Sequence, residues 1–97
     1  MRLSKEQTNI IKKAVKENFG ENAVVYLFGS RTDDKKRGGD IDLYIETDKK
    51  KDLLEKKIKM LVQLHKNLGE QKIDIILNNF KGGKYIYEVA RREGVLL

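Results

Sequence analysis

The hydrophobic residues follow two kinds of spacing, which alternate along the chain. The first spacing, three or four residues, places side chains on one face of a helix, and Ile11, Ala14, Val15 and Phe19 follow it. Ser4 and Gln7 fit a capping box ahead of this segment, and Gly20 follows it. We therefore predict a first helix that begins after Ser4 and is closed by Gly20.

Three short segments, residues 23–28, 41–46 and 72–77, instead carry the pattern of strands. In the second segment Asp42, Tyr44 and Glu46 would face away from the apolar residues between them, and Asp40 would join them if the strand extends back. In the third, Asp74 lies in mid-strand with apolar neighbours on both sides. The pattern thus predicts strands that carry carboxylates on one face.

A longer helix is expected between the second and third strands. Thr47 or Asp48 could cap it and Gly69 would end it. Its apolar stripe comprises Leu53, Leu54, Ile58, Leu61, Val62, Leu64 and Leu68. After a turn-rich segment, residues 84–92 resemble a short last helix, followed by an apolar tail at residues 95–97.

This succession predicts one α/β (α+β) domain over residues 1–97: a small mixed β-sheet flanked by helices, in the order α-β-(loop or short α)-β-α-β-α. The 97 residues allow a single modest core. Strand order does not follow from the pattern. For a domain this short, we expect a partner protein to supply any complex acceptor.

Charge and composition narrow the choice of partners. Lys and Arg outnumber Asp and Glu by 21 to 15, which favours an anionic partner or simply a solvated lysine surface. The run Lys49-Lys50-Lys51 would open the second helix, and we expect it to be exposed; direct nucleic-acid binding is the minority interpretation. No apolar run could span a bilayer and no signal-peptide pattern opens the chain, so we expect a cytoplasmic protein with no membrane partner.

Asp40, Asp42 and Asp74 would converge if the second and third strands are adjacent. Such a cluster repels itself unless a cation neutralises it, and hard oxygen ligands suit Mg²⁺. Gly29 and Ser30 form a turn whose backbone could approach a phosphate, and Arg31 could add charge. Mg²⁺ beside a phosphate-binding turn indicates phosphoryl or nucleotidyl transfer.

Each of these features also has an ordinary explanation. Surface strands often carry an Asp-x-Asp pair, and Gly29-Ser30 alone could be a simple turn. Arg31 could form a structural ion pair, and Tyr44 could either flank a nucleotide or pack within the sheet. His65, the only histidine, has no second histidine or cysteine to form a transition-metal site, so we expect it at a surface or boundary position.

Together, Gly29-Ser30-Arg31, Asp40-Ile41-Asp42 and the distal Asp74 resemble the signature of the DNA polymerase beta-like nucleotidyltransferase superfamily. In size the chain is similar to the minimal nucleotidyltransferases of that superfamily. The resemblance implies an enzyme that uses ATP and Mg²⁺, in which Gly29, Ser30 and Arg31 bind the nucleotide. It also implies that Asp40 and Asp42 hold the metal, and that Asp74 completes the metal site and activates the acceptor.

Similar minimal members act as antitoxins, paired with helical HEPN ribonuclease toxins whose tyrosine they adenylylate. The resemblance therefore implies an adenylyltransferase antitoxin whose partner is a HEPN-type toxin. The chain departs from many relatives at residues 32–37, where charged residues replace small ones. Two alternatives remain: a non-catalytic antitoxin that keeps the fold and covers its partner, and a basic nucleic-acid-binding domain.

Overall fold

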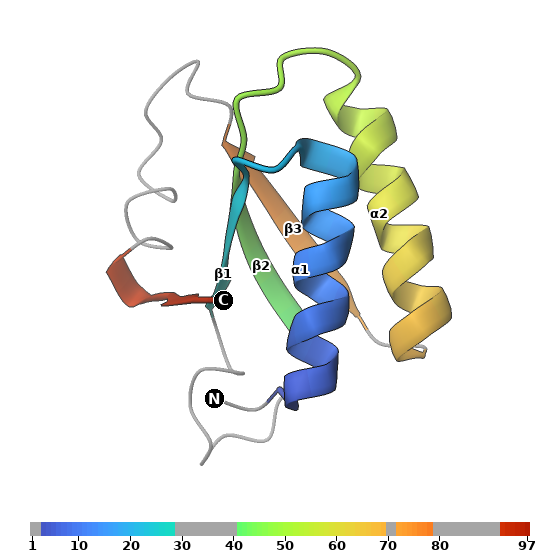
Figure 1. Ribbon diagram of the computed structural model, residues 1–97, viewed down its shortest axis with the longest axis vertical. Coiled ribbons are helices and arrows are strands. Elements are labelled where there is room, and N and C mark those ends of the chain that lie inside the picture. The colour runs from blue at the N-terminus through green and yellow to red at the C-terminus, as the bar shows by residue number, and fades with distance from the viewer. Residues whose placement is uncertain (1–2, 29–40, 70–71, 79–91) are drawn as a thin grey trace.

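The structure is a computed structural model, and it describes residues 3–28, 41–69, 72–78 and 92–97. Its elements, in chain order, are α1 (Lys5–Phe19), β1 (Val24–Phe28), β2 (Ile41–Glu46), α2 (Leu53–Leu68), β3 (Ile73–Asn78) and β4 (Val95–Leu96). The strands form one sheet in the order β3-β2-β1-β4 (Figure 1). β1 is antiparallel to β2 and β4, whereas β2 and β3 are parallel. The predicted small mixed sheet with helices is confirmed.

α1 and α2 lie side by side against one face of the sheet (Figure 1). The core forms between this helix layer and the alternate strand residues that face it. Its most deeply buried members are Ile11, Ala14, Val15 and Phe19 of α1, Leu27 of β1, Ile41, Leu43 and Ile45 of β2, and Met60 and Leu64 of α2. Because strand side chains alternate between faces, burial of this set turns Asp42 and its alternate neighbours to the opposite face.

The predicted limits of α1 are confirmed. Ser4 Oγ accepts a hydrogen bond from the Gln7 amide at 3.0 Å, and the Ser4 amide donates to Gln7 Oε1 at 2.9 Å, which completes the capping box. At the other end, the Gly20 amide donates to Lys16 O at 3.0 Å. Gly20 has a φ of 99°, a conformation that glycine adopts readily.

The predicted cap of α2 was wrong, because the helix begins only at Leu53. Thr47 instead uses its hydroxyl in a tertiary contact: Oγ1 donates to Phe19 O at 2.9 Å and accepts from the Lys49 amide at 3.1 Å. Asp52 precedes the helix with a φ of 57° and makes no side-chain cap. Lys49-Lys50-Lys51 therefore lies before α2, not within it, and is exposed as expected.

The predicted apolar stripe of α2 was right only in part. Leu64 is fully buried, and three stripe members pack partly against the core: Leu53, Leu61 and Leu68. Three others are exposed: Leu54, Ile58 and Val62. Met60, which the prediction left out, is fully buried. The apolar residues cover more than half of the helix circumference, so the sheet contact, and not the spacing, decides which of them are buried.

The C-terminal residues contain a strand that the sequence did not predict. Val95 and Leu96 form β4, which pairs with β1 through Leu27 and Tyr26. The expected last helix lies mainly in residues 84–91, outside the described part of the chain. Within the described residues, neither helix combines the length and the apolarity needed to cross a bilayer.

Candidate functional site

The face of the sheet away from the helices carries the predicted strand carboxylates. We call it the polar face, and its members are Val24, Tyr26 and Phe28 from β1, Asp42, Tyr44 and Glu46 from β2, and Asp74, Ile76 and Asn78 from β3. Strand alternation places them together, because register partners on neighbouring strands project to the same face.

Asp42 and Asp74 are direct register partners across the parallel pair of β2 and β3. Backbone hydrogen bonds hold both ends of this pairing: the Ile41 amide donates to Lys72 O at 2.9 Å, and the Thr47 amide donates to Asn78 O at 3.0 Å. A slip of one residue would move Asp74 to the core face, so this register is what places the two carboxylates side by side. The convergence of Asp42 and Asp74 was conditional on the two strands being adjacent, and this condition is met.

The environment of the two carboxylates differs. Asp42 is half-buried between Phe28 of β1 and Asp74, its register partners on either side, whereas Asp74 is exposed. Neighbouring strands lie about 4.8 Å apart, and like charges directly opposite each other destabilise a sheet. A hard divalent cation would relieve this repulsion, and carboxylate oxygens are the ligands that Mg²⁺ prefers. The donor set therefore fits Mg²⁺.

The rest of the predicted site lies outside the described residues: Asp40 of the metal set, and Gly29, Ser30 and Arg31 of the nucleotide-binding set. Within the described part of the chain, no group of three or more His, Cys, Asp or Glu side chains could hold a metal ion. The pair formed by Asp42 and Asp74 is therefore the portion of the predicted site that the structure brings together. The catalytic and binding roles of all six residues stay predictions.

Beyond this pair, the polar face continues into a buried hydrogen-bond network. Tyr44 is only 1% exposed, and its hydroxyl donates to Glu46 Oε2 and accepts from Asn78 Nδ2, both at 2.9 Å. The rings of Tyr26 and Tyr44 lie with their centroids 5.7 Å apart. These contacts agree with the interpretation of Tyr44 as a residue that packs within the sheet. The role of Asn78 in this network could not be recognised from the sequence, because its partner Tyr44 lies 34 positions away.

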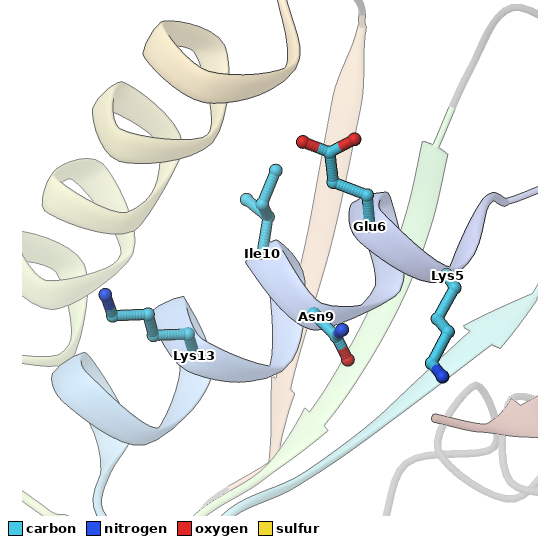
Figure 2. A pocket seen from close by; sticks show the side chains of 5 residues that line it. All are labelled: Lys5, Glu6, Asn9, Ile10 and Lys13. Carbon is cyan, nitrogen blue, oxygen red and sulfur yellow. The ribbon is translucent and has the colours of Figure 1, made fainter.

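A surface hollow of about 500 Å³ lies on α1, on the other side of the sheet from the carboxylate pair. Its lining residues are Lys5, Glu6, Asn9, Ile10 and Lys13. Figure 2 shows Glu6 and Ile10 pointing to one side of the helix and Lys5 and Asn9 to the other, so no charged groups converge within it. His65 is exposed on α2, in agreement with the surface position expected for it.

Comparison with known protein families identifies the chain. Residues 9–97 match the model of the family described as polymerase beta, nucleotidyltransferase. The chain belongs to this nucleotidyltransferase family. The match begins within α1 and covers α2 and the strands that the structure describes, and therefore includes the paired Asp42 and Asp74. No curated protein matches the chain. Family membership assigns it to transferases of nucleotidyl groups, consistent with the mixed sheet and its carboxylate-bearing face.

Proposed function

We propose that the chain is a Mg²⁺-dependent nucleotidyltransferase that transfers AMP from ATP to an acceptor hydroxyl. We further propose that the acceptor is a tyrosine of a HEPN-type toxin, so that the chain is the cytoplasmic antitoxin of a toxin–antitoxin pair. The observation that carries the proposal is the register pairing of Asp42 with Asp74 in a chain of the nucleotidyltransferase family. The toxin partner rests on the resemblance to minimal nucleotidyltransferases.

Two features favour a functional pair over two ordinary surface aspartates. The carboxylates oppose each other in register, which costs stability, whereas a protein that needed only solubility could carry one charge or a neutral side chain. Asp42 is also half-buried on a central strand, where apolar residues are usual. Two carboxylates held side by side supply the oxygen ligands that a divalent cation needs.

In the proposed reaction, the acceptor oxygen attacks the α-phosphorus of ATP. A new oxygen–phosphorus bond forms, the bond from the α-phosphorus to the bridging oxygen breaks, and pyrophosphate leaves with the electron pair. The proton of the acceptor hydroxyl passes to a carboxylate oxygen of Asp74, whose exposure leaves room for the acceptor to approach. Gly29, Ser30 and Arg31 would hold the triphosphate and orient it.

Asp40 and Asp42 would hold Mg²⁺, and Asp74 would complete the site. When bound, the ion would neutralise charge on the triphosphate and on the departing pyrophosphate. A carboxylate has two oxygens, so Asp74 could contact the ion through one and accept the proton through the other. The backbone pairing of β2 with β3 holds Asp42 and Asp74 next to each other, which supports these proposed roles.

The decisive experiment is transfer of label from ATP labelled at the α-phosphate. The purified chain, Mg²⁺ and this ATP are incubated with lysate of the native host, and labelled proteins are resolved by size. We expect one labelled band whose yield falls at least about 100-fold in Asp42→Asn and in Asp74→Asn. ATP labelled at the γ-phosphate should leave no label, because that phosphate departs in pyrophosphate.

Glu21→Gln is the matched control, since it also replaces a carboxylate by its amide but at an exposed position of the turn after α1. It should transfer like wild type. Mg²⁺ should raise the melting temperature of wild type and of Glu21→Gln but not of Asp42→Asn. Label that persists in Asp42→Asn would overturn the assignment of the site. A correctly folded wild type that inhibits its partner without any label would favour the non-catalytic antitoxin.

A further inference from the structure

One side of α2 presents aliphatic side chains to solvent. Leu54 is 70% exposed, Ile58 52% and Val62 62%. They follow one another at intervals of four residues, so they form a continuous stripe along two turns of the helix. We call this the α2 stripe. Single exposed aliphatic residues are common on protein surfaces, but three aligned on one helix form the kind of contiguous patch that marks an interaction site.

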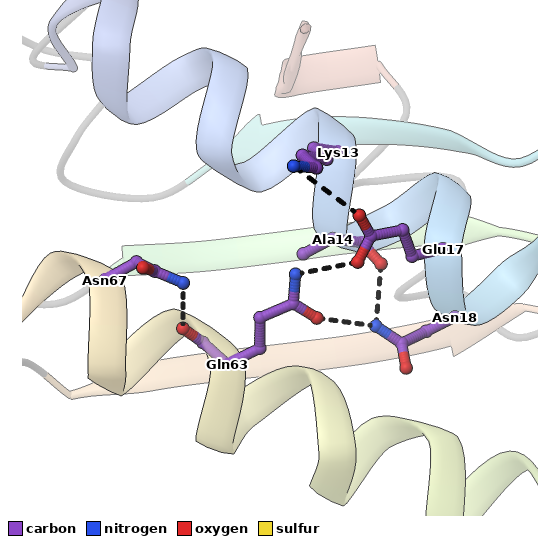
Figure 3. Close-up of polar contacts among 6 residues, drawn as sticks. All are labelled: Lys13, Ala14, Glu17, Asn18, Gln63 and Asn67. Carbon is purple, nitrogen blue, oxygen red and sulfur yellow. Dashed lines mark hydrogen bonds and ion pairs between the residues drawn. The ribbon is translucent and has the colours of Figure 1, made fainter.

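The α2 stripe lies on the side of the helix away from α1. Gln63 marks the side that faces α1: its Nε2 donates to Glu17 Oε2 at 3.0 Å, and its Oε1 accepts from Asn18 Nδ2 at 3.2 Å (Figure 3). At about 100° per residue, Ile58 lies about 140° around the helix from Gln63. The core already holds Met60 and Leu64. The stripe therefore contributes neither to helix pairing nor to the core.

A surface hollow adjoins the N-terminal end of the stripe. It measures about 520 Å³, and its lining residues are Asp52, Leu53, Leu54, Glu55, Ile58 and Lys59. Leu53, Leu54 and Ile58 line the hollow together with the aliphatic part of the Lys59 side chain. A lysine can cover apolar surface in this way while its charge stays in water. An apolar side chain from another molecule could anchor here, as interface hot spots do in pockets.

The charge around the stripe indicates what would cover it. Residues 48–66 contain seven lysines against three acidic residues, so the segment is net positive although Asp52 and Glu55 line the hollow. The exposed lysines of α2 include Lys59 and Lys66. An occupant would therefore need apolar residues at helical spacing with acidic residues beside them. We propose that the α2 stripe docks an acidic amphipathic helix of a partner protein, by packing apolar faces together between complementary charges.

The same charges disfavour a second copy of this chain. In a two-fold interface the stripe would meet itself, so the net positive segment 48–66 of one copy would oppose the same segment of the other. A lipid surface fits less well than a helix, because the stripe contains no aromatic residue and interfacial helices typically carry Trp or Phe. The proposal does not depend on nucleotidyl transfer and can be tested without nucleotide.

The test uses a labelled synthetic helical peptide with leucines at positions i, i+4 and i+7 and glutamates flanking them. A second peptide carries lysines in place of the glutamates. Fluorescence anisotropy is followed as each peptide is titrated with the full chain. We expect the acidic peptide to bind at least about tenfold more tightly than the basic one, with an affinity that falls as salt is raised.

Ile58→Ser should weaken binding of the acidic peptide at least about tenfold, because it removes the centre of the apolar contact. The exposed position predicts that the variant folds, which its circular dichroism melt checks. Leu96→Ser is the matched control: Leu96 is also exposed, at 59%, but lies in β4 at the edge of the sheet. It should bind like wild type.

Three results would overturn the proposal. The first is equal or absent binding of the two peptides at concentrations up to about 1 mM, a weak-binding limit. The second is self-association of wild type that Ile58→Ser abolishes in sedimentation experiments, which would assign the stripe to a second copy. The third is a chain that binds vesicles of phosphatidylcholine and phosphatidylserine but not the acidic peptide. If Ile58→Ser abolished this vesicle binding, the stripe would be assigned to membranes.

Discussion

Replacing Thr47 by valine should destabilise the fold, although valine has nearly the same shape. Thr47 is 1% exposed, and its hydroxyl is the donor to Phe19 O at the end of α1. The last carbonyls of a helix have no partner within the helix, so this hydrogen bond supplies one from the end of β2. The hydroxyl also accepts from the Lys49 amide, which fixes the chain leaving the strand.

The expected magnitude follows from these two hydrogen bonds. A typical intramolecular hydrogen bond contributes about 1 kcal/mol, and a buried polar group left without its partner costs about 1–3 kcal/mol. Because valine preserves the packing but not the hydroxyl, we expect the free energy of unfolding to fall by about 2 kcal/mol. In a domain of this size, such a loss should lower the melting temperature by about 10 °C.

Urea unfolding followed by circular dichroism measures this loss, with Thr47→Ser as the matched variant. Serine keeps the hydroxyl and removes one methyl group, which should cost about 1 kcal/mol. The reasoning requires valine to be the more damaging substitution, with the slope of the urea dependence unchanged. If serine destabilises the protein as much as valine, the methyl contact rather than the hydroxyl holds this junction, and the hydrogen-bond explanation is refuted.

Two further substitutions test the end of α1 and the buried hydrogen-bond network of Tyr44. Gly20→Ala should lower the free energy of unfolding by about 1–3 kcal/mol, because Gly20 has φ 99° and ψ 162°, a region that other residues avoid. A Cβ at this position would also lie 3.1 Å from Lys49 Cε. A urea midpoint equal to that of wild type would contradict this prediction. Tyr44→Phe should lower the free energy of unfolding by about 1–3 kcal/mol, because it removes the hydrogen bonds to Glu46 and Asn78 from a buried position. Thermal unfolding measures this loss. An unchanged melting temperature would show that these hydrogen bonds do not stabilise the fold.

Local patterns in the sequence were sufficient to predict most elements. The capping box of Ser4 and Gln7 depends on residues three positions apart, so it could be recognised from the sequence and is present in the structure. The alternation in residues 41–46 likewise predicted which side chains of β2 face away from the core. In both cases the interactions that determine the structure are local.

Features that depend on distant partners were missed. Thr47 resembles a helix cap in sequence but binds Phe19 O, 28 positions earlier. Strand order, and with it the contact of Asp42 with its neighbouring strand, also depends on long-range pairing that no local pattern contains. β4 is a strand only because β1 offers a free edge to Val95 and Leu96. Partners close in sequence were therefore predictable, whereas partners set by topology were not.

The register pairing of Asp42 and Asp74 has a consequence for folding. The two residues are 32 positions apart in the sequence, with α2 between them, and come together only when β3 has paired with β2. Parallel pairing of this kind requires closure of a long loop, which makes it slow compared with the antiparallel contact of β1 with β2. A partly folded chain with only the β1–β2 pair would therefore contain Asp42 but not the carboxylate pair, so a partial fold would have no assembled site.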